Sequence, residues 1–460
     1  MRQRRAIELE ELLAVRAPSV DSHYYGEEER KLVRRGVSSV VPEKKKAYFT
    51  HKYRRQGGSL VKLVLLFAGA WLLLELIRPK LAKYQKYTAT QLLPPIQQPS
   101  DTYHVLRCPE LPPPGYPREY PILEVLNNWN TKRVDPKDRP KTIYQGICVF
   151  DLSTTTNRAD LLLQKQIQNY RAAEVPFVVR NDPAVLQAVA LWNQSGYLEN
   201  KLDEKTFEAT ISNSAIMTYF SMDPNYNEIP KDFTSPTRKV PMSFQQWKQR
   251  ATTSAKTSTS TLERKNNQRE YAYLRLDACL SGKDCDAAYR GNPHQLDNAD
   301  FIYKDLSFLQ PDHSQYYNIE ANWSRGVQCR FAEAGITAED HFDNERNYIV
   351  LLKGERRFLL GHPKNCPTMH LFPQKHPLER HSQLDWSDPD LTRFPGFVNT
   401  TINEVVLQAG DVLYLPTYWF HHIVSLSLNY QCSTRSGYSV EYDQIIYDCG
   451  FFYDFPSYQS

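Results

Sequence analysis

The sequence lacks a strong excess of charge of either sign. Its 460 residues carry 56 Lys and Arg against 52 Asp and Glu, which gives a formal net charge of +4. A charge so close to neutral provides no global electrostatic field that would favour nucleic acid as a partner, and we expect none. The length is compatible with two or three structural units.

Long apolar runs are also scarce. With 30 Pro and a low mean hydropathy, the chain does not resemble a bundle of membrane helices. The exception is Leu60 to Ile77, which is apolar apart from Lys62 and Glu75 near its ends. As a helix it would span about 27 Å, close to the hydrocarbon core of a thin bilayer. Because a cleaved signal peptide would not follow a long charged leader, we predict a transmembrane signal anchor at residues 59–78 rather than a buried core helix.

Cysteine is absent before this apolar run. All eight Cys follow it, as do the Asn-X-Ser/Thr sequons at Asn193, Asn322 and Asn399. An even number of Cys favours an oxidising compartment. More Lys and Arg precede the run than follow it, which favours a cytosolic N-terminus. We therefore predict a single-pass type II membrane protein of the endoplasmic reticulum, Golgi or cell surface, with its C-terminal domain luminal or external.

The segments on either side of the apolar run have no pattern typical of a folded core. Residues 1–58 are mixed in charge and predict a largely disordered cytosolic tail. In this tail Arg2, Arg4 and Arg5 resemble an arginine-based retention signal, although a solvated basic end explains them better. Residues 79–120 are rich in Pro and predict an extended stem. Cys108 needs a partner, which could bring part of this stem onto the globular domain expected at residues 121–460.

Alternating helix and strand patterns begin near Tyr120. The Asn181-Asp182-Pro183 sequence predicts the start of a helix that reaches Trp192. The segment from Thr252 to Glu270, rich in Ser, Thr, Lys and Asn, predicts an exposed loop, and Phe301 to Tyr317 leads into later strands. Strands are also predicted at Gly146–Asp151 and Val175–Arg180, and helices at Ile122–Trp129, Ala159–Ala173 and Ser243–Arg250.

The strongest chemical signal lies between Gly335 and Phe358, at His341-Phe342-Asp343. Side chains at i and i+2 of a strand share a face, so His341 and Asp343 would point to one side while Phe342 packs on the other. Two further strands, Tyr348–Leu352 and Arg356–Leu360, are predicted around a Lys353-Gly354 turn.

A second signal, in which His421 follows His341 by eighty residues, is Gly410-Asp411-Val-Leu-Tyr-Leu-Pro416-Thr-Tyr-Trp-Phe-His421-His422. It predicts a tight turn, a buried strand, a Pro-led turn and a His that opens the next strand. Two His and one carboxylate on neighbouring strands form the facial triad that suits non-haem Fe(II) and leaves coordination positions open. His422 is a competing ligand, but it would face away from His421 across the strand.

These motifs, with Asn347 and the Lys353-Gly-Glu-Arg356-Arg turn, resemble the JmjC/cupin-like 2-oxoglutarate oxygenases over roughly residues 115 to 440. His376 to Pro395 is similar to the subgroup related to the asparaginyl hydroxylase that restrains hypoxia-inducible factor. Gln431 to Gly437 looks like membrane-anchored relatives. The resemblance implies a mainly β fold, a double-stranded β-helix of the jelly-roll or cupin type with an α-helical N-terminal layer, here preceded by a single transmembrane helix.

The resemblance also implies a chemistry. His341, Asp343 and His421 would hold Fe(II), and decarboxylation of 2-oxoglutarate would drive hydroxylation, most naturally of a protein side chain. Arg356 stands where the resembling hydroxylases carry a Lys that pairs with the distal carboxylate of 2-oxoglutarate, and an Arg fork differs from an ammonium in shape. Asn347 and Thr337 match positions that hydrogen-bond the co-substrate or line its pocket, although satisfaction of strand edges explains them equally well.

Structural roles are expected for three neighbours. Arg357 would point to the face opposite Arg356 and lie at the surface, while Tyr348 and Trp419 would belong to the core. The Cys279 and Cys285 pair could close a small disulfide loop.

Two other function classes compete with an oxygenase. One is a catalytically silent binding module on the same scaffold, supported by the Arg at position 356. The other is a Golgi-type glycosyltransferase that binds a nucleotide-sugar through a divalent metal at Asp284-Cys285-Asp286, although no apolar strand precedes that motif.

Overall fold

The computed structural model describes residues 106–153, 161–257, 269–278, 300–310, 316–317 and 324–453. The predicted cytosolic tail, the apolar run at residues 59–78, and most of the predicted stem lie outside these ranges. So do Cys279 and the Asp284-Cys285-Asp286 motif. Among the described residues, no helix is both long and apolar enough to cross a bilayer.

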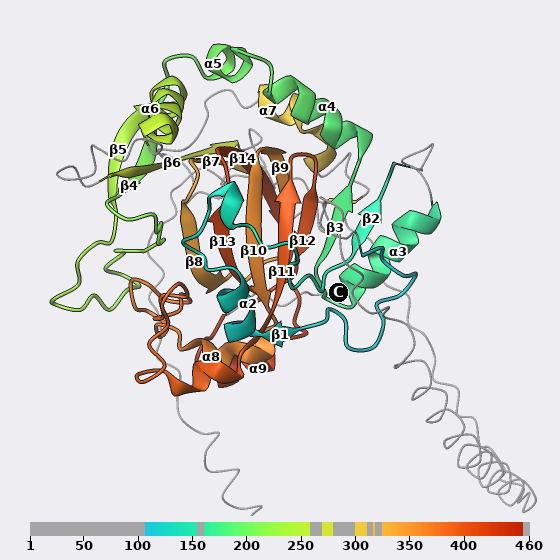
Figure 1. Cartoon of the computed structure of the whole chain (residues 1–460), viewed down its shortest axis with the longest axis vertical. Coiled ribbons are helices and arrows are strands. Elements are labelled where there is room, and N and C mark those ends of the chain that lie inside the picture. The colour runs from blue at the N-terminus through green and yellow to red at the C-terminus, as the bar shows by residue number, and fades with distance from the viewer. Residues whose placement is uncertain are drawn as a thin grey trace, which may run out of the picture. The chain divides into compact units, whose positions relative to one another are not determined.

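Two β-sheets form the centre of the described part of the chain (Figure 1). The five-stranded sheet has the order β1 (Tyr120–Pro121), β11 (Thr401–Gln408), β10 (Glu355–Gly361), β13 (Phe420–Ser425) and β8 (Thr337–Phe342). The nine-stranded sheet has the order β2 (Val149–Asp151), β3 (Phe177–Arg180), β12 (Val412–Leu415), β9 (Asn347–Lys353), β14 (Asn429–Ser436), β7 (Ser324–Ala332), β6 (Tyr271–Ala278), β4 (Thr206–Ser212) and β5 (Arg238–Ser243).

From β7 onward, successive strands cross repeatedly between the two sheets. β7, β9, β12 and β14 belong to the larger sheet, and β8, β10, β11 and β13 to the smaller. The predicted Lys353-Gly354 turn makes one such crossing. Gly354 has a φ of +74°, and a Cβ there would lie 2.3 Å from the Leu428 carbonyl oxygen, so glycine is required at this turn. The mainly β fold expected from the sequence is confirmed.

Helices cover the ends and the outer face of this β-structure. In Figure 1, α4 to α7 lie at the upper end, whereas α2, α8 and α9 lie at the lower end. The bounds of the helices are α2 Ile122–Asn128, α3 Leu161–Ala172, α4 Pro183–Trp192, α5 Tyr197–Leu202, α6 Phe244–Thr257, α7 Asp300–Asp305, α8 Cys366–Met369 and α9 Asp443–Asp448, with short 3₁₀ turns at Pro136–Asp138, Ser307–Leu309, Pro363–Asn365 and Pro395–Asn399.

The two faces of β9 show how the core is divided. Tyr348, Val350 and Leu352 belong to the apolar cluster that the N-terminal helices cover, whereas Ile349 and Leu351 belong to the cluster between the sheets. The alternation is the period of two that a strand imposes, and both faces are buried, so β9 is apolar throughout. Tyr348 is therefore a core residue, as predicted.

Local signals account for where several helices begin and end. The Asp182 side chain accepts a hydrogen bond from the Ala184 amide at 2.9 Å, and Pro183 follows it, so the predicted start of α4 is confirmed. α6 runs to Thr257 and thus extends into the loop predicted to begin at Thr252. Polar composition suggested a loop there, but Phe244, Trp247 and Ala251 are buried at helical spacing and hold α6 against the sheet.

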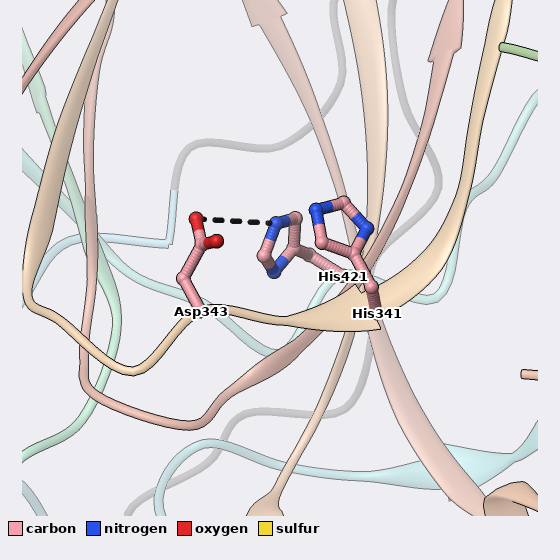
Figure 2. A group of neighbouring side chains, drawn as sticks. All are labelled: His341, Asp343 and His421. Atoms are coloured by element: carbon pink, nitrogen blue, oxygen red, sulfur yellow. Dashed lines mark ion pairs between the residues drawn. The ribbon is translucent and has the colours of Figure 1, made fainter. Parts of the chain in front are cut away.

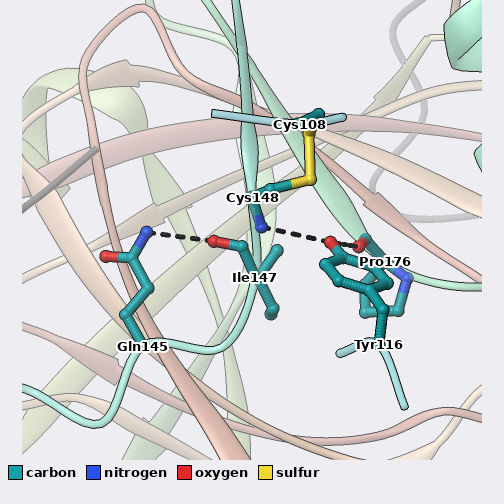
Figure 3. The surroundings of a disulfide bond; sticks show 6 residues. All are labelled: Cys108, Tyr116, Gln145, Ile147, Cys148 and Pro176. Carbon is teal, nitrogen blue, oxygen red and sulfur yellow. Dashed lines mark hydrogen bonds between the residues drawn. A yellow bond between two sulfur atoms is a disulfide. The ribbon is translucent and has the colours of Figure 1, made fainter. Parts of the chain in front are cut away.

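Residues 106–120 pack on the domain, although the sequence placed them in an extended stem. Cys108 forms a disulfide with Cys148, and Arg107 bridges to Val149 in parallel register. Figure 3 shows the surroundings: the Tyr116 hydroxyl donates to the Pro176 carbonyl at 2.6 Å and accepts from the Cys148 amide at 3.1 Å. The packed structure thus extends past the boundary predicted at residue 120, because Cys108 finds its partner at Cys148, directly before β2.

We predict that replacing Cys108 and Cys148 together by Ser lowers the free energy of unfolding by about 2–4 kcal/mol, since the disulfide closes a long loop in the unfolded chain. Urea unfolding under non-reducing conditions measures this loss. Tyr116→Phe is the matched variant, because it keeps the disulfide and the ring but loses the hydroxyl. An unchanged midpoint for the double variant would show that the N-terminal segment contributes nothing to stability.

Candidate metal centre and cavity

The structure brings His341, Asp343 and His421 together between two neighbouring strands. His341 lies near the end of β8, Asp343 follows its last residue, and His421 is the second residue of β13, directly opposite His341 in the antiparallel register. One potential ligand atom from each residue lies within 4.8 Å of the others. Figure 2 shows the Asp343 carboxylate beside the His421 ring, where Nε2 lies 3.9 Å from Oδ2.

Backbone contacts set the tautomer of both imidazoles. Nδ1 of His341 lies 2.7 Å from the Glu339 carbonyl oxygen, and Nδ1 of His421 lies 3.0 Å from the Trp419 carbonyl oxygen. Because a carbonyl can only accept, each Nδ1 carries the proton and each Nε2 presents a lone pair. Burial lowers the pKa of both rings, which keeps them neutral. Oriented, neutral imidazoles of this kind fit a divalent metal.

The third candidate ligand is held as a carboxylate by nearby cations. Burial alone would raise the pKa of Asp343, but the guanidinium groups of Arg435 and Arg380 help to hold it below its usual range. Nη2 of Arg435 donates to Oδ2 of Asp343 at 2.6 Å, and Nη1 of Arg380 lies 3.8 Å from Oδ1. Asp343 therefore enters the site ionised and oriented, as a metal ligand must be.

A cavity of about 440 Å³ opens beside these residues. That size suits a small-molecule ligand. His341 and Asp343 lie in its wall, and the remaining lining is unusually rich in cations and aromatic rings. The lining residues are Thr210, Met217, Thr218, Tyr219, Phe220, Thr237, Lys239, Tyr273, Arg275, Gln328, Arg330, Ala338, Glu339, His341, Asp343, Asn344, Glu379, Arg380, His381, Arg435 and Tyr453.

A bulge in β8 decides which of its residues face the cavity. Opposite the two steps from His421 to Ile423 on β13, β8 takes three steps, from His341 to Ala338. The extra residue reverses the alternation, so Ala338 shares the face of His341 and lines the cavity. Thr337, which the resemblance placed at the co-substrate, is not in the lining, and its hydroxyl donates to the Gly335 carbonyl at 3.4 Å.

The two other residues carried over for the co-substrate lie behind the cavity wall. Arg356 is 1% exposed on β10, donates to the side chain of Gln431 and neighbours Tyr273, but it does not line the cavity. Asn347 is buried at the start of β9, opposite Arg435 on β14. Both are near the site, and neither faces the open volume.

The positions predicted for His422 and Trp419 agree with the structure, whereas the position predicted for Arg357 does not. His422 faces away from the triad, as predicted, and stacks on Trp386 with ring centroids 4.9 Å apart. Arg357 is 1% exposed, so its predicted surface position is wrong. It does point away from Arg356, but the segment after α2 covers that face: Arg357 Nη1 donates to the Trp129 carbonyl at 2.7 Å, and its Nε donates to Glu404. Trp419 is fully buried, as predicted.

Sequence reasoning missed the residues that surround the triad. Arg435 reaches Asp343 from β14, and His381 stacks on His341 with centroids 4.9 Å apart. Arg380 adds a second cation beside Asp343. Arg380 and His381 lie in a segment without helix or strand, so no periodicity indicates their direction. For Arg435 a signal was available in the period of two of a strand. Gln431 and Arg435 are four residues apart on β14, so their side chains share a face, and this pattern could have indicated a polar face there.

Comparisons with known proteins agree with this geometry. A family model described as a cupin-like domain matches residues 163–443, more than half of the chain. The tRNA wybutosine-synthesizing protein 5 of Gallus gallus is 31% identical over 96 residues, which are 21% of this chain and 29% of that protein. Lysine-specific demethylase 8 of Danio rerio is 31% identical over 108 residues, 23% and 26% of the two chains. JmjC domain-containing protein D of Dictyostelium discoideum is 27% identical over 119 residues, which are 26% of this chain and 25% of that protein. The matched segments thus span about a quarter of each relative.

We predict that His421→Gln abolishes binding of one equivalent of Mn(II), whereas the adjacent His422→Gln leaves the stoichiometry at one. The physical reason is that only His421 turns its Nε2 toward Asp343. Equilibrium dialysis followed by metal analysis measures the stoichiometry. Equal losses in both variants would mean that the ligand set has been assigned to the wrong histidine.

Proposed function

Because the chain belongs to the cupin-like domain family, we propose that it is an Fe(II)- and 2-oxoglutarate-dependent oxygenase of the JmjC type. The observation that carries the proposal is the group of His341, Asp343 and His421, in which one potential ligand atom from each residue lies within 4.8 Å of the others. Two imidazoles and one carboxylate are the donors of non-haem Fe(II) oxygenases. When bound, Fe(II) and 2-oxoglutarate would supply the activation of O2: one oxygen atom would end in succinate as 2-oxoglutarate loses CO2, and the other would end in the hydroxyl group of the target.

The protein's own contribution is positioning and exclusion of water. The Glu339 and Trp419 carbonyls fix the two imidazoles, and Arg435 fixes Asp343, so all three donors are oriented before a metal arrives. The cavity beside them takes the co-substrate and the target group. No side-chain general base is needed, because no proton has to be removed from the target by the protein.

A polypeptide side chain is the substrate that we propose. The segment between β4 and β5 places Phe220 in the cavity lining, and the exposed residues Tyr219, Met222, Tyr226 and Ile229 lie on the same segment. Aromatic residues and Met exposed on a segment that reaches the cavity favour a protein partner. The names of the relatives specify tRNA in one case and lysine in another, whereas the resemblance to hydroxylases favours hydroxylation here.

We also propose that the domain is luminal or external, behind a type II anchor at residues 59–78. Three disulfides among the described residues support an oxidising compartment: Cys108–Cys148, Cys329–Cys432 and Cys366–Cys449. The charge difference around Leu60–Ile77 supports the orientation.

We predict that Mn(II) and 2-oxoglutarate together raise the unfolding temperature of a secreted fragment beginning near Gln91. At one hundred times the dissociation constant, a ligand adds about 2.7 kcal/mol to the free energy of unfolding. This corresponds to several degrees for a domain of this size. Asp343→Ala should lose the joint effect.

The same measurement separates the competing functions. Stabilisation by Mn(II) with a nucleotide-sugar, and none with 2-oxoglutarate, would instead support the glycosyltransferase. A folded protein that responds to neither pair of ligands would sink the oxygenase and leave the silent binding module.

For the topology, we predict that Asn399 is glycosylated and Asn193 is not. Asn399 is exposed, whereas Nδ2 of Asn193 donates to the carbonyls of Val189 and Leu352 at 2.7 and 2.8 Å. A glycosylated amide keeps one hydrogen and could not make both bonds. In a eukaryotic host, Asn399→Gln should remove one endoglycosidase-sensitive mobility shift and Asn193→Gln none. A chain without any glycan at Asn399 would contradict a luminal domain.

A further inference from the structure

Two arginines face each other directly across the sheet that forms one wall of the cavity. Arg330 on β7 pairs with Arg275 on β6, and on its other side with Gln431 on β14. Both arginines line the cavity that also contains His341 and Asp343. Like charges directly opposite on antiparallel strands destabilise a sheet, so the pair needs a compensating negative charge.

Among the residues that the structure describes, only Arg275 has a carboxylate as its ion-pair partner. Nε and Nη2 of Arg275 donate to the two carboxylate oxygens of Asp277 at 3.0 and 2.9 Å. Arg330 contacts only neutral groups, with Nη1 3.4 Å from Oγ of Ser433 and Nη2 3.4 Å from Oε1 of Gln328. Over the described ranges, no carboxylate lies within ion-pair distance of Arg330.

Burial makes this lack of a partner costly. Burial is the main cause that lowers the pKa of Arg330, and Arg275 and Arg435 lower it further, whereas Tyr273 and Asp277 raise it without reversing the shift. The other cations of the lining are compensated: Lys239 pairs with Glu208 at 2.8 Å, and Arg435 with Asp343 at 2.6 Å. An anion that enters the cavity therefore gains most at Arg330, whose fork can bind a carboxylate through two parallel hydrogen bonds.

We propose that Arg330, with Arg275 beside it, binds the distal carboxylate of 2-oxoglutarate. This inference rests on the proposed function, and it moves the anchor from the position that the resemblance suggested. Arg356 donates to Gln431 and stands outside the lining, whereas Arg330 lines the open volume. Arg356 then supports the wall, and Arg330 makes the contact with the ligand.

The test is titration of the full-length chain with 2-oxoglutarate in the presence of saturating Mn(II), for wild type, Arg330→Gln, Arg356→Gln and Lys239→Gln. Arg330→Gln should weaken 2-oxoglutarate binding about 10- to 100-fold, as expected for loss of a charged hydrogen-bonded pair. Its affinity for Mn(II) should not change. Lys239→Gln removes an equal charge from the lining and should weaken binding less than about fivefold, because Lys239 is an exposed ion-paired side chain.

Thermal unfolding of the ligand-free variants supplies a second readout. Arg330→Gln should unfold at the same temperature as wild type or at a higher one, because it removes the repulsion from Arg275. A purely structural arginine would give the reverse: a lower unfolding temperature and unchanged 2-oxoglutarate affinity. That result would overturn the inference, as would a loss of binding in Arg356→Gln with none in Arg330→Gln.

Glutarate distinguishes failure of this inference from failure of the proposed function. It keeps both carboxylates of 2-oxoglutarate but lacks the 2-oxo group. If wild type binds Mn(II) but not 2-oxoglutarate, the oxygenase proposal fails. Binding of glutarate that Arg330→Gln abolishes would then still support a dicarboxylate site at Arg330. If wild type binds neither compound, both proposals are overturned.

Discussion

The strands β7 and β14 of the larger sheet have one face in an apolar core and the other face in a polar cavity, and the rest of the structure depends on this division. On β7, Cys329 and Phe331 join the apolar cluster beneath the helices, whereas Gln328 and Arg330 face the cavity. On β14, Cys432 joins that cluster and Arg435 faces the cavity. The apolar face provides the free energy of burial that lets the opposite face hold charged groups at an energetic cost.

The polar face is organised around a small number of buried charges. Asp343 is the anion that Arg435 and Arg380 approach, and Nε2 of His421 lies 3.9 Å from its carboxylate. Replacing one member of a buried ion pair leaves the other charge buried without a partner and destabilises the fold. Single substitutions among these charged residues are therefore expected to be destabilising. A metal would join an arrangement in which the ligands are already held by the backbone and by arginines, rather than create that arrangement.

Sequence patterns predicted the parts of the fold that local physics controls. Alternation around His341 and the Pro-led turn before His421 were enough to bring the triad together, and the Asp182-Pro183 cap located α4. The register was not predictable, because it arises from pairing between distant strands. The β8 bulge therefore moved the cavity face from Thr337 to Ala338, and Arg357 was misplaced because the segment that covers it lies more than two hundred residues earlier. Arg330 gave no sequence signal, since the role proposed for it rests on the lack of a carboxylate beside it in the described part of the chain.

The disulfide between Cys108 and Cys148 has a mechanical consequence. Tension applied to the chain before Cys108 passes through the sulfur bridge directly to Cys148, at the start of the parallel β2–β3 pair. Residues 109–147, which include α2 and β1, form a closed loop outside that load path. Pulling on the N-terminal side therefore loads β2 and β3 first, while the loop that covers Arg357 remains slack.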